Sequence, residues 1–411
     1  MTEQMNVPKL RFNGFEGDWI SHRINDVSEC VTSGSRDWAK YYSDKGDKFV
    51  RMTNLGREGI NLLLEDMRYV SIPKGGSEGQ RTSLQENDIL ISITAELGKI
   101  GIIPKDFGTA YINQHTALVR VNQQVNAKFL AQNLATKKSN KKINRLNDSG
   151  AKSGLNLSTI RNFEFTAPAS LSEQQKIASF LSKVDEKIAL LTEKKDKLTE
   201  YKKGVMQQLF NGSFQEQDGQ LTFIPPTLRF KADDGSEFPD WVEKKLGALF
   251  SISAGGDISK EHSSTVKTDK FKYPVFANAE TNKGLHSYSD IYKVAQPCLT
   301  VSGRGSLGNA VFRDEPFYPI VRLLVLKAAL QVDLKFYEYA INKLNIFNES
   351  TGVPQLTAPQ LRTYIVVMPC IEEQKKIARA IESLDRKIAL VFLELKKAKE
   401  WKKGLLQQMF V

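Results

Sequence analysis

The 411-residue sequence has few of the patterns that mark secreted or membrane-spanning proteins. Its three cysteines, Cys30, Cys298 and Cys370, are far apart and odd in number, which favours reduced thiols over a disulfide framework. The first residues, MTEQMNVPKLRF, lack an apolar signal segment. The most apolar run, YPIVRLLVLKAAL, is interrupted by Arg322 and Lys327 well short of a membrane span. We therefore expect a cytoplasmic protein that does not bind membranes.

Motifs for catalysis and for cofactors are also missing. The four histidines show no metal-ligand spacing, and the chain has neither a phosphate-binding G-x-x-x-x-G-K-[ST] loop nor the Asn/Asp-Pro-Pro-aromatic stretch of adenine methylation. Gly303, Gly305 and Gly308 spell G-x-G-x-x-G, but the NAVF that follows is typical of a strand, whereas dinucleotide binding requires a helix there. The sequence predicts no catalytic residue, no metal and no cofactor in this chain.

Acidic residues are outnumbered: 58 Lys and Arg oppose 47 Asp and Glu, for a formal net charge of +11. Such an excess favours polyanionic partners, because cations that neutralise phosphates release counterions. Nucleic acid is the first candidate, although many soluble proteins are mildly basic. With 41% apolar residues, each half of the chain can bury a core of its own, and the length suggests two to three domains.

The chain contains an internal duplication. Residues 173–210 align without gaps with residues 373–410, and 18 of the 38 positions are identical. Upstream, PKLRF at 8–12 precedes Trp19 as PTLRF at 226–230 precedes Trp241. A repeat of half the chain is too long for a solenoid and fits a duplicated domain plus a helix.

Each copy of the repeat predicts a long helix with a coiled-coil seam. Apolar residues recur at alternating steps of four and three over five heptads, a 3.5-residue period. The predicted packing residues are Ile177, Leu181, Val184, Ile188 and Leu191 in the first copy, and Ile377, Ile381, Leu384, Ile388 and Val391 in the second. Both series continue to Leu209 and Met409, interrupted by lysines at 195, 202 and 402. If unbroken, 38 residues make a rod of about 57 Å.

The simplest arrangement pairs these two helices antiparallel and makes one chain pseudo-two-fold; pairing with another subunit is the alternative. We expect Ser172 to cap the first helix. Gly204 and Gly404 would mark a bend or a close contact, or merely allow the helix ends to fray.

The segments between the helices read as α+β domains with mostly antiparallel, curved sheets. Residues 87–103 and 296–312 each predict two strands around a turn, and residues 127–138 and 334–345 predict short helices. We expect a first domain at 1–152, a helical spacer at 153–212, a second domain at 213–352 and a second spacer at 353–411. Outside the glycines the halves share little sequence, as expected of one scaffold that carries two different surfaces.

Taken together, these residues resemble the DNA specificity subunits of type I restriction-modification systems. The resemblance covers nearly the whole chain. It rests on the duplicated Glu-Gln-x-Lys-Ile-Ala helix starts (173–178, 373–378), the Asp-x-Lys-Ile-Ala-Leu centres (185–190, 385–390), the Lys-Lys-Gly-x-x-Gln-Gln-x-Phe ends (202–210, 402–410), and Trp19 and Trp241 near the domain starts. The Leu-Asn-Leu-Ser stretch at 155–158 becomes Pro-Gln-Leu-Thr at 354–357, which departs from a strict repeat.

The resemblance implies two target recognition domains, joined by two helices that form an antiparallel coiled coil. Each domain would read one half of a split, asymmetric site in double-stranded DNA. The helices would set the gap between the halves and dock two modification subunits, which methylate adenine and in turn recruit restriction subunits. S-adenosylmethionine, ATP and Mg²⁺ would then belong to those partner subunits, and this chain would be a non-catalytic recognition subunit.

Base reading requires Arg, Lys, Asn or Gln side chains at the groove edges, and phosphate contacts require cations or backbone amides. The candidates in the first domain are Ser35, Arg36, Arg51, Asn54, Lys137, Lys138, Lys141, Lys142 and Arg145. Those in the second domain are Asn278, Asn282, Lys283 and Arg304. For each lysine, the alternative is a solvated surface charge.

Two other classes of function stay open from the sequence. One is an enzyme whose site residues are scattered along the chain. The other is a coiled-coil scaffold whose globular halves bind protein, for which salt-dependent DNA affinity would be absent. Neither explains both the duplicated helices and the diverged domains.

Overall fold

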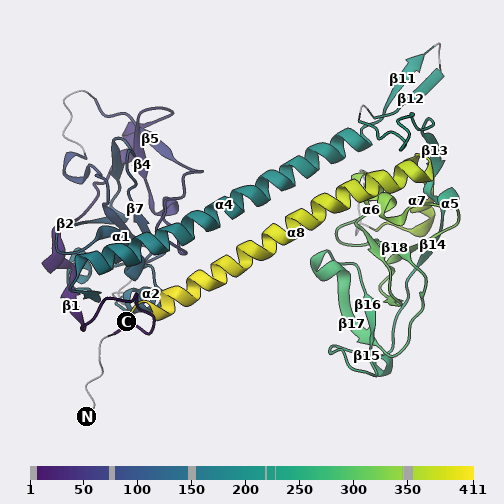
Figure 1. Cartoon of the computed structure of the whole chain (residues 1–411). Coiled ribbons are helices and arrows are strands. Elements are labelled where there is room, and N and C mark those ends of the chain that lie inside the picture. The colour runs from purple at the N-terminus through teal and green to yellow at the C-terminus, as the bar shows by residue number, and fades with distance from the viewer. Residues whose placement is uncertain are drawn as a thin grey trace. The chain divides into compact units, whose positions relative to one another are not determined.

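The computed structural model describes residues 7–73, 79–146, 154–217, 220–226, 228–344, 346 and 355–411. The chain forms two compact units, the first comprising Met1–Glu193 with Phe392–Val411 and the second Lys194–Val391. Two long helices, α4 (Leu171–Phe210) and α8 (Ile371–Gln408), contribute to both units (Figure 1). The predicted domain boundaries at 152, 212 and 352 stay predictions.

The first unit contains two four-stranded sheets. One has the strand order β2-β9-β6-β7 and the other β3-β5-β4-β8, and a separate pair joins β1 to β10. The strands are β1 (Trp19–Arg23), β2 (Ser28–Ser33), β3 (Tyr42–Ser43), β4 (Asp47–Val50), β5 (Arg68–Val70), β6 (Ile89–Ser92), β7 (Ile100–Ile102), β8 (Ala110–Ile112), β9 (Thr116–Val121) and β10 (Glu164–Pro168). The helices are α1 (Ala127–Leu134), α2 (Lys137–Arg145) and α3 (Leu157–Arg161), with 3₁₀ turns at Ile24–Val27, Trp38–Tyr41, Met52–Asn54 and Gln80–Thr82.

The second unit repeats this topology. Its sheets have the orders β14-β21-β18-β19 and β15-β17-β16-β20, and β13 pairs with β22 as β1 pairs with β10. The strands are β13 (Val242–Lys245), β14 (Phe250–Ala254), β15 (Ser263–Ser264), β16 (Tyr273–Phe276), β17 (Leu285–Ser289), β18 (Cys298–Val301), β19 (Ala310–Arg313), β20 (Tyr318–Pro319), β21 (Leu324–Ala328) and β22 (Ile365–Met368). A hairpin of β11 (Ser213–Gln217) and β12 (Gln220–Ile224) precedes them, the helices are α5 (Leu246–Leu249), α6 (Leu334–Lys343) and α7 (Ala358–Thr363), and 3₁₀ turns lie at Lys260–His262 and Thr281–Gly284.

The predicted strand pairs are confirmed in both units. β6 pairs antiparallel with β7, and β18 with β19. Gly308 has φ +81° in the turn between β18 and β19, so this glycine serves a hairpin and not a nucleotide-binding loop. The helix predicted at 127–138 ends at Leu134, because Thr136 caps a new helix by accepting the amide of Ser139.

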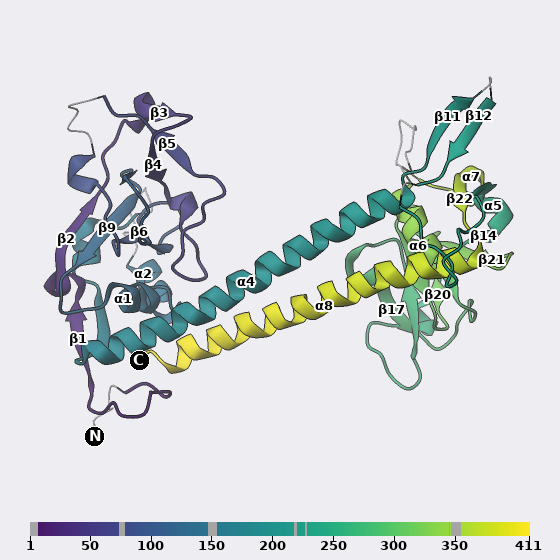
Figure 2. The same cartoon turned by 45° about the horizontal axis from the view of Figure 1, so that its top comes forward.

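Within each unit, the start of one long helix packs against the end of the other. In the first unit Ile177 and Leu181 share a core with Leu405 and Met409. In the second unit Ile377 and Ile381 share a core with Val205 and Leu209 of α4. Because the start of one helix packs against the end of the other, α4 and α8 are antiparallel in both units, as predicted (Figure 2). All ten predicted seam residues are buried or half-buried.

Two of the three lysines that interrupt the apolar seam form ion pairs across the two helices, whereas Lys195 pairs with Asp196 on its own helix. Lys402 Nζ lies 2.5 Å from Asp185 Oδ1 in the first unit, and Lys202 Nζ lies 2.5 Å from Asp385 Oδ1 in the second. Each lysine of one repeat thus meets the aspartate of the other repeat. The breaks in the heptad pattern at Lys202 and Lys402 are therefore ion pairs between the helices.

The phenylalanine that ends each repeat packs on aromatic residues of the globular part of a unit. Phe410 lies 5.3 Å from Phe129 and 6.3 Å from Trp19, measured between ring centroids. Phe210 lies 5.5 Å from Phe336, which itself contacts Trp241. The duplicated helix end is thus a duplicated domain contact, one in each unit.

A buried glutamate and glutamine begin each long helix. Glu173 accepts two hydrogen bonds from Arg11, each at 2.8 Å, and Glu373 accepts two from Arg229 at 3.1 and 2.8 Å. These bonds explain the repeated Leu-Arg-Phe segments, because a buried carboxylate requires a paired cation. The same hydrogen bonds raise the pKa of both arginines.

The glutamine of each pair joins the helix to the domain backbone. Gln174 accepts from the amide of Asn126 and donates to the carbonyl of Pro168. Gln374 makes the same two bonds, with Asp333 and Pro369. Trp241 Nε1 also donates to Glu373, whereas the buried Trp19 Nε1 has no hydrogen-bond partner among the described residues.

Two helix predictions need correction. α4 begins at Leu171, so Ser172 lies in its first turn, and the residue ahead of the helix is Ser170, whose Oγ accepts the amide of Glu173 at 3.4 Å. Gly204 and Gly404 lie inside continuous helices, and a Cβ at either would meet no atom of the described chain within 4 Å. They therefore make no close contact within the chain.

Among the described residues, no helix is both long enough and apolar enough to span a bilayer.

We predict that Arg229→Ala strongly destabilises the protein. Glu373 is fully buried and would keep its charge without its cation, which costs about 3 kcal/mol or more. Urea-induced unfolding should show this loss as a lower midpoint. The control is Lys231→Ala, because Lys231 pairs with Glu237 at 3.8 Å with both side chains mostly exposed, and about 0.5 kcal/mol or less is expected. Equal losses in the two variants would contradict a structural role for the buried pair.

Candidate nucleic-acid interface

In each unit, three segments meet at one end of one four-stranded sheet, β2-β9-β6-β7 in the first unit and β14-β21-β18-β19 in the second. In the first unit these are the loop after β6, the loop between β8 and β9, and the residues before α3; Thr94 bridges to Gly154, and Ser35 to Asn113. In the second unit Arg304 bridges to Gln355, and Gly256 to Ile320. We call these two places the loop junctions, defined by Ser35, Thr94, Asn113, Gln114, His115 and Gly154 in the first unit, and by Gly256, Asn278, Arg304, Val321, Arg322 and Gln355 in the second.

The two loop junctions share the same backbone contacts. Ser92 and Ser302 each accept an amide with their Oγ across the hairpin turn, from Lys99 and Asn309 respectively. Before each junction the chain passes so close to a carbonyl of the neighbouring strand that only glycine fits: a Cβ on Gly255 would lie 2.6 Å from Pro319 O, and Gly34 is tighter still against Ile112. The glycines that the halves share thus hold the frame, while the side chains on it differ.

The polar side chains of Thr94, Gln114 and His115 occupy the first junction. His115 Nδ1 lies 2.9 Å from Thr94 Oγ1, and its Nε2 lies 3.0 Å from Gln114 Nε2. Because the amide nitrogen of Gln114 can only donate, His115 Nε2 accepts, and Nδ1–H donates to Thr94. His115 thereby orients the Gln114 amide. An oriented glutamine amide has the donor and acceptor pattern that matches adenine in the major groove.

Two sequence-predicted residues belong to the first junction. Ser35 accepts the amide of Gln114 at its carbonyl, 3.1 Å away, and is half-buried. Arg36 follows it directly and is exposed. The structure thus brings Ser35 and Arg36 beside Gln114 and His115.

Arginine side chains occupy the second junction. Arg304 Nη2 donates to Gln355 Oε1 at 3.2 Å, and its buried Nε has no hydrogen-bond partner among the described residues. Asn278 connects the loops, since its Nδ2 donates to the carbonyl of Val321 and its Oδ1 accepts the amide of Gly303. Asn278 is therefore a residue that positions the junction, because its amide is already used within the chain.

The backbone of the second junction is strained at Val321 and Arg322. Both have positive φ, 52° and 59°, a region that β-branched residues rarely adopt. Hydrogen bonds hold the turn, from Val321 N to Gly256 O and from Asn278 to Val321 O. Strain of this kind gathers at binding sites. The exposed Arg322 lies against Gly303, the residue before Arg304, since a Cβ on Gly303 would lie 3.3 Å from the carbonyl oxygen of Arg322.

Two other predicted residues hold a loop instead of facing solvent. Asn54 is 1% exposed, donates to the carbonyl of Leu63 and accepts the amide of Arg51. Arg51 donates to the carbonyl and the carboxylate of Asp66. We therefore no longer expect Asn54 to read bases, and Arg51 has its guanidinium engaged by Asp66.

Asn282 and Lys283 form an exposed left-handed turn. The carbonyl of Lys283 accepts from Arg313 Nη2 at 2.6 Å. Arg313 faces Cys298 across β18 and β19, at the opposite end of that hairpin from Arg304. Asn278 thus contacts the loop of Arg304 through Gly303, whereas the turn at Asn282 and Lys283 lies away from the second loop junction. Burial lowers the pKa of Arg313 to about 10, and raises that of the Cys298 thiol to about 11.

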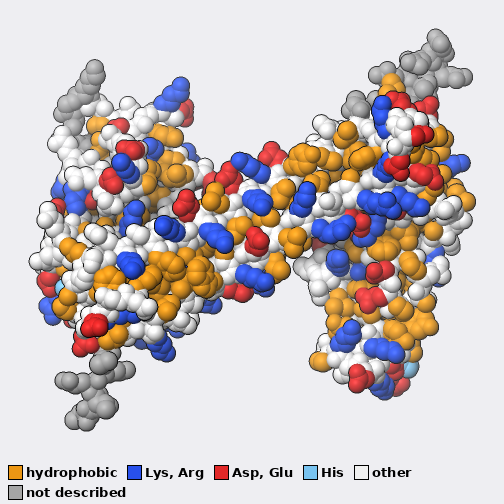
Figure 3. All heavy atoms as spheres, in the orientation of Figure 1, with side chains coloured by type: hydrophobic (Ala, Val, Ile, Leu, Met, Phe, Trp, Pro, Cys, Tyr) orange, Lys and Arg blue, Asp and Glu red, His pale blue; other side chains and the backbone are white. Residues whose placement is uncertain are grey.

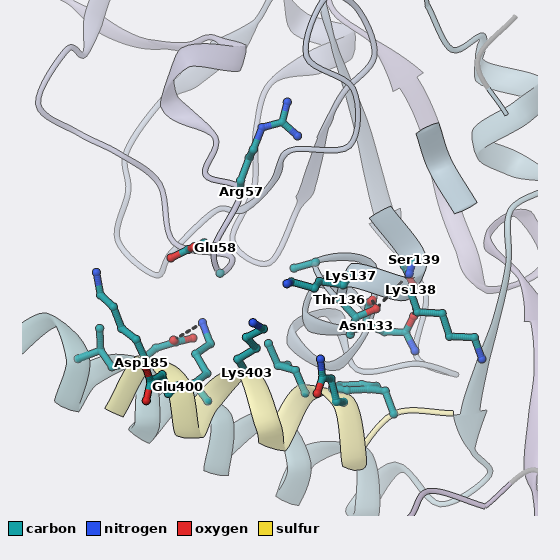
Figure 4. A pocket seen from close by; sticks show the side chains of 18 of the residues that line it. Arg57, Glu58, Asn133, Thr136, Lys137, Lys138, Ser139, Asp185, Glu400 and Lys403 are labelled. Atoms are coloured by element: carbon teal, nitrogen blue, oxygen red, sulfur yellow. Dashed lines mark hydrogen bonds and ion pairs between the residues drawn. The ribbon is translucent and has the colours of Figure 1, made fainter. Parts of the chain in front are cut away.

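The five predicted cations at 137–145 lie on α2, and all five are exposed. Lys142 donates to the carbonyl of Glu164 and lies over the ring of Phe163, so it is partly engaged. Lys137 and Lys138 line a cavity beside α8 (Figure 4). Figure 3 shows further Lys and Arg side chains along the visible face of the helices.

Sequence reasoning missed Gln114, His115, Arg322 and Gln355. A usable signal existed for two of them, since Arg322 interrupts an apolar run and Gln355 lies in the segment that departs from the repeat. Gln114 and His115 carry no such mark, because only the fold brings them to Thr94. Within the described residues, no group of three or more His, Cys, Asp or Glu side chains could hold a metal ion.

Comparisons with known proteins agree with this architecture. A type I specificity subunit of Mycoplasma pneumoniae is 25% identical over 292 residues, which cover 70% of this chain and 72% of that protein. The MjaX specificity subunit of Methanocaldococcus jannaschii is 23% identical over 431 residues, covering 98% and 95%.

Solved structures share the fold. The crystal structure of a type I restriction-modification S subunit from M. genitalium matches with a TM-score of 0.65 and 15% identity, over 98% of this chain and 99% of that one. A chain from a study of complex assembly and conformational transition of a type I system matches with a TM-score of 0.54 and 13% identity, over 95% and 96%.

The sequence profile of the type I restriction modification DNA specificity domain matches this chain twice, over residues 16–200 and 239–399. Each match covers the globular part of one unit with most of the long helix that follows it. The chain therefore belongs to the family of type I restriction-modification DNA specificity subunits.

Proposed function

We propose that this chain reads a bipartite, asymmetric DNA site, one half with each loop junction, and docks two modification subunits on its long helices. The observation that carries the proposal is the matched pair of junctions. Their backbone frames correspond strand by strand, yet one presents Gln114, His115 and Thr94 and the other Arg304, Arg322 and Gln355. A duplicated frame with different side chains is what two different half-sites require.

The proposed docking surface is repeated in the same way. Leu190 and Leu390 occupy equivalent repeat positions and are 59% and 64% exposed. Tyr201 and Trp401, also equivalent, are more than half exposed. Gly204 and Gly404, one turn further along, leave open space beside these aromatic residues, which would let a partner helix approach closely. Exposed apolar residues at duplicated positions support one docking site in each unit.

In this proposal the chain supplies recognition, and the modification and restriction subunits supply the chemistry. Those subunits would hold S-adenosylmethionine, ATP and Mg²⁺. We propose the cytoplasm as its location, where such a complex would meet DNA.

We predict that cells expressing the chain with a competent modification subunit acquire adenine methylation at one two-part motif with a fixed gap. Single-molecule sequencing of genomic DNA measures the motif, and cells with the modification subunit alone are the control. Methylation without a motif, or none from a stable complex, would argue for the scaffold alternative. Methylation by this chain alone would argue for an enzyme.

The docking surfaces predict a change of stoichiometry. Leu190→Glu should remove one modification subunit and leave a one-to-one complex, because a charge in an apolar interface is costly to desolvate. Leu390→Glu should remove the other, and the double variant should bind none. Native mass spectrometry measures the ratio. Since both leucines are exposed, thermal unfolding should be unchanged, and a full two-to-one complex from the double variant would refute this surface.

The junctions predict separable half-site effects. Arg304→Ala and Arg322→Ala should each relax the half-site read by the second unit by about 1–3 kcal/mol per contacted base, and leave the first half-site unchanged. Gln114→Ala should do the reverse, so each variant controls for the other. Methylation motifs of the variant complexes give the readout. Equal losses on cognate and random DNA would reassign the residue concerned to phosphate contact.

A further inference from the structure

The first unit contains a cavity of about 580 Å³ between α2, the loop at residues 57–59 and the two long helices (Figure 4). Six cations line it: Arg57, Lys137, Lys138, Lys399, Lys402 and Lys403. Three carboxylates line it as well, those of Glu58, Asp185 and Glu400. Its walls therefore carry a net excess of positive charge.

Only part of this charge is neutralised locally. Lys402 pairs with Asp185 at 2.5 Å, and Arg57 lies 4.0 Å from Glu96. Lys137 and Lys403 form no ion pair with any described residue, although both are exposed and point into the cavity from opposite walls (Figure 4). One comes from the recognition domain and the other from the C-terminal helix.

The Lys403 ammonium group disfavours the charged form of Lys137. Lys403 is the main cause of a lowered pKa at Lys137, Lys141 lowers it further, and Glu58 only partly opposes them. Two unpaired cations held side by side form a site for a shared anion, since the anion removes their repulsion.

The backbone of α2 adds to this preference. Thr136 caps the helix through Ser139, and Lys137 and Lys138 follow as its first two residues. By position, their amides have no acceptor within the helix, and the helix dipole is positive at this end. A phosphate oxygen is a suitable partner for such amides.

The rest of α2 favours DNA over an acidic protein segment as the source of the anion. Its nine residues, KKSNKKINR, contain five cations and no acid. Lys137 therefore begins a helix that carries four further cations. Lys and Arg residues clustered along a helix are typical of a surface that contacts a phosphate backbone.

We propose that Lys137 of α2 and Lys403 of α8 together bind one phosphate of the DNA backbone at the mouth of this cavity. The inference rests on the proposed DNA-binding function and adds to it that the C-terminal helix contacts DNA directly. The described residues place this site in the first unit. Lys203 is the repeat counterpart of Lys403, but in the second unit α6 ends at Lys343, and the described residues after it form no helix equivalent to α2.

The test compares Lys137→Ala and Lys403→Ala with Lys203→Ala in complexes that contain the modification subunits. DNA affinity is measured by fluorescence anisotropy on cognate and scrambled duplexes over a range of salt concentrations. Loss of one phosphate contact should lower the slope of log K against log salt by about 1 and weaken binding about fivefold near physiological salt, equally on both duplexes. Lys203→Ala should leave both quantities at wild-type values.

Each other outcome has a definite meaning. Unchanged slopes for Lys137→Ala and Lys403→Ala, with normal DNA binding by the wild type, would overturn the shared phosphate site and leave the proposed function intact. Unchanged slopes with less modification subunit retained on purification would assign the cavity to protein docking. Absence of salt-dependent binding by the wild-type complex would refute the proposed function itself. Because both side chains are exposed, thermal unfolding should match the wild type and excludes misfolding as the cause.

Discussion

The buried glutamate at the start of each long helix is the interaction on which the rest of the structure depends. A carboxylate without solvent contact is tolerated only with a cation and further donors, and Arg11 and Arg229 supply that cation from segments more than 140 residues away in sequence. The adjacent glutamine fastens the same helix turn to the backbone at both ends of its amide. The rotation and the axial position of the helix start are therefore fixed relative to its domain. Because the helix is continuous, they also fix which way the following helix residues of the same unit face.

This anchoring explains how one repeated sequence can serve two purposes. Once the rotation is set, Ile177 and Leu181 face the core, Asp185 meets Lys402, and Leu190 points to solvent. The second copy reproduces the arrangement in its own unit with Ile377, Ile381, Asp385 and Leu390. Tyr339 adds a hydrogen bond to Asp385, and burial together with that carboxylate raises the pKa of Tyr339. The inward face of the repeat thus fixes the fold, and its outward face is free to bind a partner.

The parts that the sequence predicted correctly depend on local periodicity. The seam and the two hairpins follow from local sequence pattern, since residues four and three apart share a helix face and β-branched stretches around a turn form paired strands. The antiparallel pairing was expected as the simplest arrangement of a duplicated helix and from the family resemblance, because the spacing does not fix the direction of the partner helix. The junction residues could not be found in this way, because Thr94, His115 and Gly154 meet only through tertiary structure. Asn54 and Asn278 were plausible as base readers by type, yet their amides satisfy loop backbone groups, and no local pattern distinguishes those two uses of asparagine. Ser172 was predicted as the cap of α4, whereas Ser170 precedes the helix, a difference of two residues that is common at helix boundaries.

The same physics explains why the two junctions could diverge without loss of fold. Their frames are held by backbone hydrogen bonds, such as Leu155 N to Ile93 O in one unit and Leu356 N to Gly303 O in the other, and by glycines at close approaches. None of these requires a particular side chain at 94, 114, 304 or 322. Substitution at those positions therefore changes the pattern of donors and charges at nearly constant stability. A position is less free to change where its side chain holds the backbone in place. Asn278 is such a residue in the second unit, because it supports the strained turn at Val321 and Arg322. A binding surface built in this way can change its specificity through few substitutions. The buried Glu-Gln pairs and the helix seam tolerate fewer changes, and for this reason the repeat can still be detected in the sequence.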